Sequence, residues 1–246
     1  MIKTIRIGQM AGLLFLFALA ASAFAQQTPA TNSNQEFFDA IRKGDVAGVR
    51  TFLQKDPTLA KAVRSSGTTA LQYAAYAKQP QIIEMLLATG IQPNIFEAAA
   101  IGQVDRVREL LKKDPSLALA WSSDGWTGLH LNFGNLEIVK LFLDNGADIN
   151  AVSRNNLVAT PLQGAAVMHN VELAKLLLSR GAKVSPRGEG GVTPLHEVSD
   201  SGDLEFAKLL LEHGADVNAK DDASKTPLAY AKTPDMEKLL REHGAK

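Results

Sequence analysis

A short motif recurs at a fixed interval of 33 residues through the second half of the chain. Its copies are Thr127–His130, Thr160–Gln163, Thr193–His196 and Thr226–Ala229. A fixed period in this range indicates one supersecondary unit stacked on copies of itself, because each unit covers the apolar face that its neighbour cannot bury alone. The chain is therefore predicted to be a repeat protein, whose function lies on the stacked surface rather than in one pocket.

The copy that begins at Thr193 shows how one repeat is built. Thr193 suits a helix N-cap and Pro194 suits the first helical position, so a first helix is expected to run to about Ser201. Apolar residues at helical spacing from Leu204 predict a second helix, and Gly214 suits the left-handed position just past its end. A polar, turn-rich stretch then leads to the next repeat. The unit is predicted to be a helix, a turn, a second helix and an extended finger.

These motifs resemble those of the ankyrin-repeat family, which begins its repeats with Thr-Pro-Leu-His and ends them with Gly-Ala-Asp-Val-Asn. The end motif is matched by Asn145–Ala151, Arg180–Val184 and His213–Ala219, at offsets that agree with the starts. The resemblance implies an all-α fold, an ankyrin-repeat solenoid of helix-turn-helix units with β-hairpin-like fingers.

The first half of the chain shows a longer duplication. Phe37–Gln72 aligns with Ile95–His130 at an offset of 58 residues, and each block is two repeats long. Seven repeats are therefore expected, with first helices near these residues: Phe37, Leu71, Ile95, Leu129, Leu162, Leu195 and Leu228.

Several repeats depart from the pattern. Gly90–Asn94 leads almost directly into Ile95, so the third repeat has no room for a full finger. The fourth repeat has a first helix two residues short, and the finger between Gly146 and Thr160 is two residues long. The last repeat is clipped, as expected of a terminal cap.

The N-terminus carries a different signal. Lys3 and Arg6 precede an apolar run, and Ala23-Phe24-Ala25 places small residues where a signal peptidase reads them. The run is shorter than the roughly 20 apolar residues of a membrane span. Residues 1–25 are thus predicted to be a signal peptide cleaved after Ala25, followed by a disordered lead-in at 26–34 and a repeat domain at 35–246. The product is expected in the periplasm or outside the cell of a Gram-negative bacterium, with no membrane attachment after cleavage.

Composition excludes several functions. The chain has 26 basic and 26 acidic residues, and because residues 1–25 hold two basic and no acidic ones, the remainder has a net charge of −2. The basic residues interleave with acidic ones on helix faces rather than clustering as phosphate contacts require, so no nucleic-acid partner is expected. With no cysteine, the chain has neither disulfides nor the usual structural zinc. A monomer is expected.

No catalytic, cofactor-binding or metal-binding residues are predicted. His130 and His196 hold the fourth place of the repeat start, where the resemblance implies a structural hydrogen bond. His213 and His243 fall in last helical turns, and His169 stands in a turn between helices. None forms a metal-spaced pair. The glycine-rich stretch Arg187–Gly191 lacks the Lys-Ser/Thr of a phosphate loop.

What remains is binding to a protein partner. The resemblance implies that partners are met on the concave side, by finger tips and by the exposed face of the first helices. The candidate partner-binding residues at those places are Tyr76, Asp124, Trp126, Asn156, Leu157, Val167, Met168, Glu189, Val192 and Asp200. An apolar centre with polar ends is typical of a protein interface. Trp126 fits either a contact or packing between fingers.

The sequence thus predicts a non-catalytic protein-interaction module that needs no cofactor. One alternative is an inhibitor or immunity-type binder of one exported protein. Another is a ligand-binding or enzymatic groove, which a pocket lined by convergent charged groups would favour.

Overall fold

The computed structural model describes residues 32–132 and 134–246. The predicted signal peptide and residues 26–31 of the predicted lead-in lie outside the described residues. The first described helix begins at Asn32, so helical structure starts three residues before the expected domain boundary and within the stretch that was predicted to be disordered.

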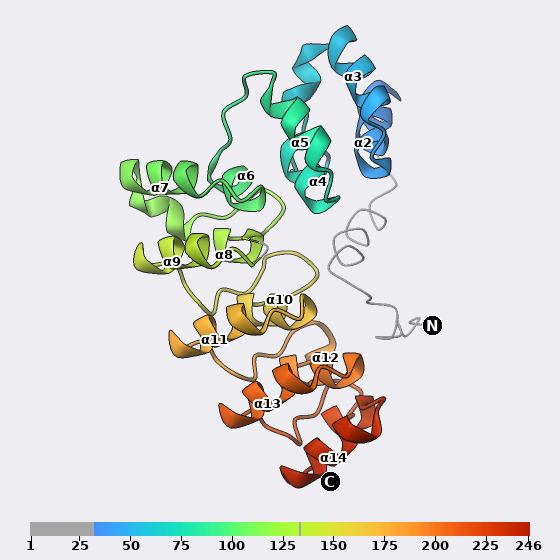
Figure 1. Cartoon of the computed structure of the whole chain (residues 1–246), viewed down its shortest axis with the longest axis vertical. Helices are drawn as coiled ribbons and strands as arrows, with labels where there is room; N and C mark the ends of the chain where they lie inside the picture. The colour runs from blue at the N-terminus through green and yellow to red at the C-terminus, as the bar shows by residue number, and fades with distance from the viewer. Residues whose placement is uncertain (1–31, 133) are drawn as a thin grey trace. The chain divides into compact units, whose positions relative to one another are not determined.

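Seven helix pairs follow one another in the described part of the chain, as the repeat count predicts (Figure 1). They are α2 (Asn32–Lys43) with α3 (Val46–Lys55), α4 (Ala70–Tyr76) with α5 (Pro80–Leu87), α6 (Ile95–Ala100) with α7 (Val104–Lys113), α8 (Gly128–Leu131) with α9 (Leu136–Asp144), α10 (Pro161–Val167) with α11 (Val171–Ser179), α12 (Pro194–Ser201) with α13 (Leu204–Glu212), and the 3-10 helix η5 (Pro227–Tyr230) with α14 (Pro234–Glu242). Short 3-10 turns stand at η2 (Pro57–Lys61), η3 (Pro115–Leu119) and η4 (Glu189–Gly191). The all-α fold class is confirmed.

The helices group into two compact units, whose described parts are residues 32–147 (the N-terminal unit) and 148–246 (the C-terminal unit). In the N-terminal unit the first helices pack in series, α2 on α4, α4 on α6 and α6 on α8. In the C-terminal unit α10 packs on α12 and α12 on η5, while α11 packs on α13 and α13 on α14.

Helix starts follow the predicted capping chemistry. Thr193 is the N-cap of α12, Pro194 is its first residue, and Thr193 with His196 forms a capping box. The His196 ring reaches onward, since its Nε2 lies 3.1 Å from the Lys225 carbonyl oxygen of the next finger. The structural role expected of His196 is thereby confirmed. Helix α12 therefore fixes both its own start and the finger that follows it.

The core consists of the apolar faces of both helices in each repeat. In the C-terminal unit Leu162 and Leu195 are 1% exposed and Phe206 is fully buried. In the N-terminal unit Leu71 is fully buried at the position that corresponds to Leu195. Burial of one apolar residue at the same place in successive repeats is what makes each repeat depend on its neighbour.

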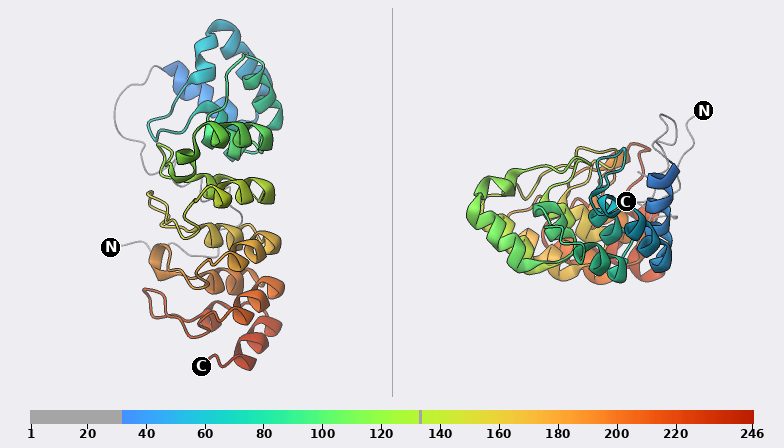
Figure 2. Two further views of the ribbon diagram at one scale, coloured as in Figure 1. Left: turned by 90° about the vertical axis from the view of Figure 1, so that its left-hand side faces the viewer. Right: turned by 90° about the horizontal axis from the view of Figure 1, so that it is seen from above.

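The fingers share one tight turn. In four of them the backbone N–H of the first turn residue donates to the carbonyl oxygen of the residue four positions later. The backbone N–H of the residue that lies two positions before the next N-cap donates back to the carbonyl oxygen of the first turn residue. The outer pairs are Arg64 with Thr68, Ser122 with Trp126, Gly188 with Val192, and Asp221 with Lys225. In the C-terminal unit the fingers project from the same side of the helices (Figure 2).

The predicted departures are present. Helix α8 has only four residues, and α6 starts directly after Asn94, its N-cap, with no finger before it. In the finger of the fifth repeat, residues 152–159 (the fifth finger), the outer pair is Ser153 with Ala159, so the turn closes over six residues instead of four. The two extra residues therefore lie at the tip of the fifth finger.

Candidate partner-binding surfaces

Two of the candidate residues in the N-terminal unit bind each other. The Tyr76 hydroxyl donates to Asp124 Oδ2 at 3.1 Å, and Thr68 Oγ1 donates to the same oxygen at 3.0 Å. Ser122 Oγ donates to the other carboxylate oxygen at 2.6 Å. Burial, and then the charge of Asp124, hold the pKa of Tyr76 well above its usual range. These side chains are engaged within the fold, which sequence reasoning did not anticipate.

Trp126 is a packing residue. It is 7% exposed, its backbone pairs with Ser122, and its ring lies 5.3 Å from the His130 ring. Of the two interpretations that the sequence left open, the structure favours packing. A partner would not reach this indole without a rearrangement of the fourth finger.

The missing third finger explains this arrangement. With no finger before α6, the second and fourth fingers approach each other directly, and a Cβ added to Gly67 would lie 2.4 Å from the Ser123 Cβ. Gly67 leaves room for that approach because it has no side chain. The contact between the two fingers is therefore a consequence of the shortened third repeat.

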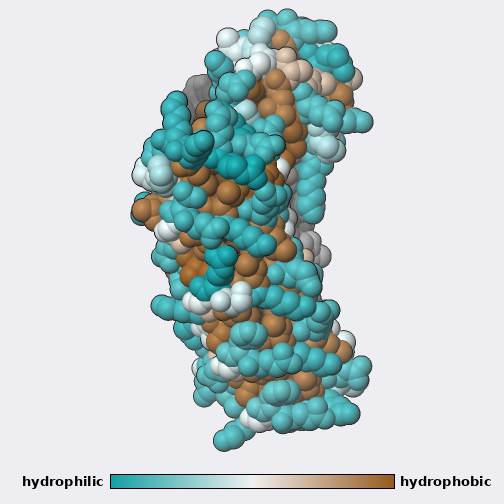
Figure 3. Space-filling view, turned by 60° about the vertical axis from the view of Figure 1, so that its left-hand side comes forward, coloured by the Kyte–Doolittle hydropathy of each residue, from teal (hydrophilic) through white to brown (hydrophobic). Residues whose placement is uncertain are grey.

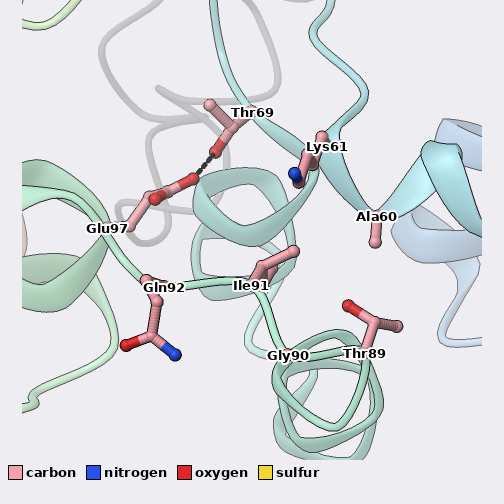
Figure 4. A pocket seen from close by; sticks show the side chains of 8 residues that line it. All are labelled: Ala60, Lys61, Thr69, Thr89, Gly90, Ile91, Gln92 and Glu97. Atoms are coloured by element: carbon pink, nitrogen blue, oxygen red, sulfur yellow. Dashed lines mark hydrogen bonds between the residues drawn. The ribbon is translucent and has the colours of Figure 1, made fainter.

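A cavity of about 520 Å³ lies between η2, α4 and the connection from α5 to α6 (Figure 4). Lys61, Ile91 and Gln92 are among the residues that line it. The carboxylate of Glu97 in its wall is already bound, by Thr69 Oγ1 at 2.7 Å and by the Asn94 N–H at 2.8 Å. The wall thus offers one ammonium group and one occupied carboxylate, not a convergent catalytic set.

In the C-terminal unit the candidate residues of the fifth finger lie at its surface. Asn156 is exposed and Leu157 is half-buried. Two neighbours that were not predicted, Val152 and Val158, are 45% and 40% exposed. The fifth finger therefore presents more aliphatic surface than the candidate set implied.

The next candidates lie at the end of helix α10. Val167 and Met168 are both half-buried. Nearby on the same helix, a Cβ added to Gly164 would meet nothing within 4 Å, so the helix leaves open space there. Partly exposed aliphatic side chains beside open space can accept the side chain of a partner.

The two candidates of the sixth finger differ. Glu189 is exposed, whereas Val192 is 8% exposed and its carbonyl oxygen accepts a hydrogen bond from Gln163 Nε2 at 3.1 Å. The Val192 side chain is largely buried and its backbone supports the finger, while its assignment as a contact residue stays a prediction.

Helix α12 carries two carboxylates one turn apart. Asp200 forms an ion pair with Lys232 at 2.8 Å. Burial, and then the charge of Asp200, raise the pKa of Glu197 to about 7. Glu197 was not predicted, although it stands only three residues before the candidate Asp200 in the sequence. Near neutral pH this carboxyl is partly protonated.

His169 serves the fold. It occupies the turn between α10 and α11 with φ of 53°, and its Nδ1 lies 3.1 Å from Asp203 Oδ2. The other oxygen of Asp203 caps α13 by accepting from the Phe206 N–H. His169 thereby links the inter-helix turn of one repeat to the second helix of the next.

The outer faces are hydrophilic ridges with hydrophobic side chains between them (Figure 3). Ion pairs join neighbouring repeats there, Arg108 with Glu137 in one unit and Lys175 with Glu205 in the other. Exposed pairs of this kind add little stability. They are the solvated faces that the interleaved charges predict.

Within the described residues, no helix is long and apolar enough to cross a membrane, and no group of three potential metal-binding side chains comes together.

Family models agree with the repeat architecture. A model of three ankyrin repeats matches residues 95–188, and a single-repeat model matches residues 66–97 and 190–222. The chain belongs to the ankyrin-repeat family. Ankyrin repeats are, as a family, protein-interaction modules and generally not enzymes.

Relatives with known names are similar over part of their length. The chain is 28% identical to an ankyrin repeat protein of Fowlpox virus over 172 residues, which are 65% of this chain and 39% of the relative. It is 33% identical over 126 residues to alpha-latrocrustotoxin-Lt1a of Latrodectus tredecimguttatus, covering 47% of this chain and 9% of the toxin. It is 36% identical over 99 residues to the E3 ubiquitin-protein ligase XB3 of Oryza sativa subsp. japonica, covering 39% of this chain and 22% of the ligase. The matched segments span well under half of the length of each relative, so the similarity covers only part of each of these proteins.

Proposed function

We propose that this protein is a non-catalytic binding module that is exported to the periplasm or secreted, and that it binds one protein partner through the C-terminal unit. The observation that carries the proposal is the set of aliphatic side chains left partly exposed on the fifth finger and at the end of α10. These are Leu157, Val167 and Met168.

Their surroundings support a protein interface. Asn156 and Glu189 are exposed polar residues on the fifth and sixth fingers, and Asp200 on α12 is partly exposed. Partly exposed aliphatic residues bordered by polar ones match the anatomy of a protein interface. The candidate residues of the N-terminal unit do not add to this surface, because Tyr76 and Asp124 bind each other.

The test uses the mature protein as bait for its partner. Leu157→Ser and Met168→Ala, made singly, should weaken capture at least tenfold, because truncating an interface anchor commonly costs about 2 kcal/mol or more in binding. Each should change the free energy of unfolding by about 0.5 kcal/mol or less, as substitutions at the surface usually do. The matched control is Lys208→Ala, at an exposed position on α13.

Two results decide the proposal. Loss of capture with unchanged stability in the two variants, and unchanged capture by Lys208→Ala, would support it. A large loss of stability with unchanged capture would show that Leu157 and Met168 belong to the core, and this surface would have to be abandoned.

Export is supported by the charged start, the apolar run and the Ala23-Phe24-Ala25 stretch. Mass spectrometry of the protein from its native host should find a mature N-terminus at Gln26. Abundant soluble protein with peptides from Phe15 to Phe24 would overturn it.

A further inference from the structure

One position of the finger turn requires a left-handed backbone. It lies two residues before the N-cap position of the following helix, and the residues there are Gly67, Gly125, Val158, Gly191 and Ser224. Their φ angles are 86°, 84°, 47°, 73° and 62°. Three fingers use glycine, which adopts this conformation freely, and one uses serine.

The fifth finger is the exception, because Val158 is β-branched. A positive φ at a β-branched residue is a genuine outlier, since its Cβ substituents crowd the backbone. The turn enforces the conformation. The Val158 N–H bonds to the Asn155 carbonyl at 3.3 Å, and the Ala159 N–H bonds to Ser153 Oγ at 2.9 Å.

Val158 is only partly buried in spite of this strain. Val158 is 40% exposed, and the fold accommodates glycine or serine at the same place in every other finger. Strained residues that the fold does not need cluster at sites that serve recognition. Val152, 45% exposed, and the half-buried Leu157 stand with Val158 on the same finger.

We infer that the lengthened tip of the fifth finger, with Val158 and Leu157 as its anchors, inserts into an apolar cleft of a partner protein that is not a second copy of this chain. The inference rests on the proposed function and deepens it, by assigning the partner an apolar, concave site. A projecting aliphatic tip is complementary to a cleft, not to a flat polar surface.

The tip itself argues against two other occupants. Stable dimers bury about 1,600 Å² in total, and a few aliphatic side chains less than half exposed supply a small fraction of that area. A membrane-binding loop uses aromatic residues and clustered Lys or Arg. The fifth finger has no aromatic residue and a single basic one, Arg154.

The first experiment exchanges residues between two fingers. Val158→Ser removes the β-branched residue from the strained position, and Ser224→Val, its matched control, introduces one into the seventh finger. Val158→Ser should leave the melting temperature unchanged or raise it by about 2–4 °C, while capture of the partner falls at least tenfold. Ser224→Val should lower the melting temperature by about the same amount and leave capture unchanged.

The second experiment places a benzophenone side chain at position 158 and, as a control, at position 224 of the full chain. A photo-adduct should form from position 158 alone, at an apolar residue of the partner. Unlabelled wild-type protein should suppress it, and the Val158→Ser protein should not.

The outcomes separate this inference from the proposed function. If wild type and Val158→Ser capture the partner equally, or if Val158→Ser melts markedly lower, the inference fails while the binding function stands. An adduct of twice the chain mass, or sedimentation of wild type but not Val158→Ser with phosphatidylglycerol–phosphatidylethanolamine vesicles, would replace the proposed occupant with a second copy or a membrane. If wild type captures no protein, both the function and the inference fail.

Discussion

The second and fourth fingers and the fifth finger are built on the same turn but use their tips in opposite ways. The second and fourth fingers meet across the place of the missing third finger, where Asp124 accepts hydrogen bonds from Thr68 and Tyr76. The fifth finger, two residues longer, leaves Leu157 and Val158 partly exposed. Where a finger is missing, its two neighbours contact each other, and where a finger is enlarged, its tip remains available as a surface.

This difference shows how a repeat protein separates stability from function. Each repeat needs its buried face and its turn, but the tip of the finger is free to vary. Where the tip is polar and meets another finger, it serves the fold. Where it is aliphatic, strained and exposed, it costs stability that the fold does not recover.

The largest effect should be the same in both units, because both depend on the first-helix leucine. Leu195→Ala in the C-terminal unit and Leu71→Ala in the N-terminal unit each remove a side chain that is 1% exposed or less. Each should lower the free energy of unfolding by about 2–5 kcal/mol, from lost burial and the cavity left behind. Urea denaturation of the two variants measures it. Midpoints that match wild type would show that the repeat register is wrong.

The contrast between the fingers predicts unequal effects at their tips. Asp124→Ala should cost about 1–3 kcal/mol, because it removes the carboxylate that accepts hydrogen bonds from Thr68, Tyr76 and Ser122. Asn156→Ala, at the exposed tip of the fifth finger, should change stability by about 0.5 kcal/mol or less. Thermal unfolding of both variants tests the comparison. Equal losses of stability would mean that the tips of the fourth and fifth fingers contribute equally to the fold.

Much of the fold could be predicted because its signals are local. The Thr-Pro starts fix the helix N-termini, as Thr193 and Pro194 show in α12, and the 33-residue period fixes the stacking. The missing third finger and the two extra residues of the fifth finger are differences in length, which can be counted. All of this follows from spacing, without knowledge of contacts.

The candidate surface could be predicted only in part because exposure depends on contacts between repeats. Tyr76 corresponds to Val167 and Asp200, which are partly exposed, but Tyr76 is 7% exposed and donates to Asp124 of the fourth finger. Val192 is 8% exposed, and its carbonyl binds Gln163, a bond between consecutive repeats. Val158, by contrast, was recognisable, since aligning the residues two before each N-cap sets one valine against glycines and a serine.

The pH dependence of stability should differ between the two units at one position of the repeat. Glu197 of the C-terminal unit corresponds to Tyr73 of the N-terminal unit, which is 9% exposed. The folded pKa of Glu197 is raised to about 7 from an ordinary value of 4.5. Its stabilising contribution is therefore complete below about pH 4.5 and is lost as the pH rises towards 7.

Glu197→Gln removes this dependence. The variant should match wild type near pH 4.5 and be more stable by about 1–2 kcal/mol at pH 8, after allowance for the partial exposure of the carboxyl. Denaturation at both pH values checks it, with Glu205→Gln on the outer face of α13 as the control. The same difference between Glu197→Gln and wild type at both pH values would mean that the Glu197 carboxyl is not buried in the folded state.

The smallest effect tests whether a finger contributes to the end of the preceding helix. Gly214 and Gly90 occupy the same repeat position, with φ of 82° and 85°, and a Cβ added to either meets nothing within 4 Å. Only backbone strain should oppose Gly214→Ala and Gly90→Ala, so each should cost roughly 1 kcal/mol in the free energy of unfolding. Gly214 is followed by a full finger and Gly90 is not. If Gly214→Ala costs much more than Gly90→Ala, the finger and the helix end are coupled, and the tip of a finger is less independent of the fold than its exposure indicates. Equal costs would show that the finger does not stabilise the end of the preceding helix, so its tip can differ between repeats, as it does in the fifth finger.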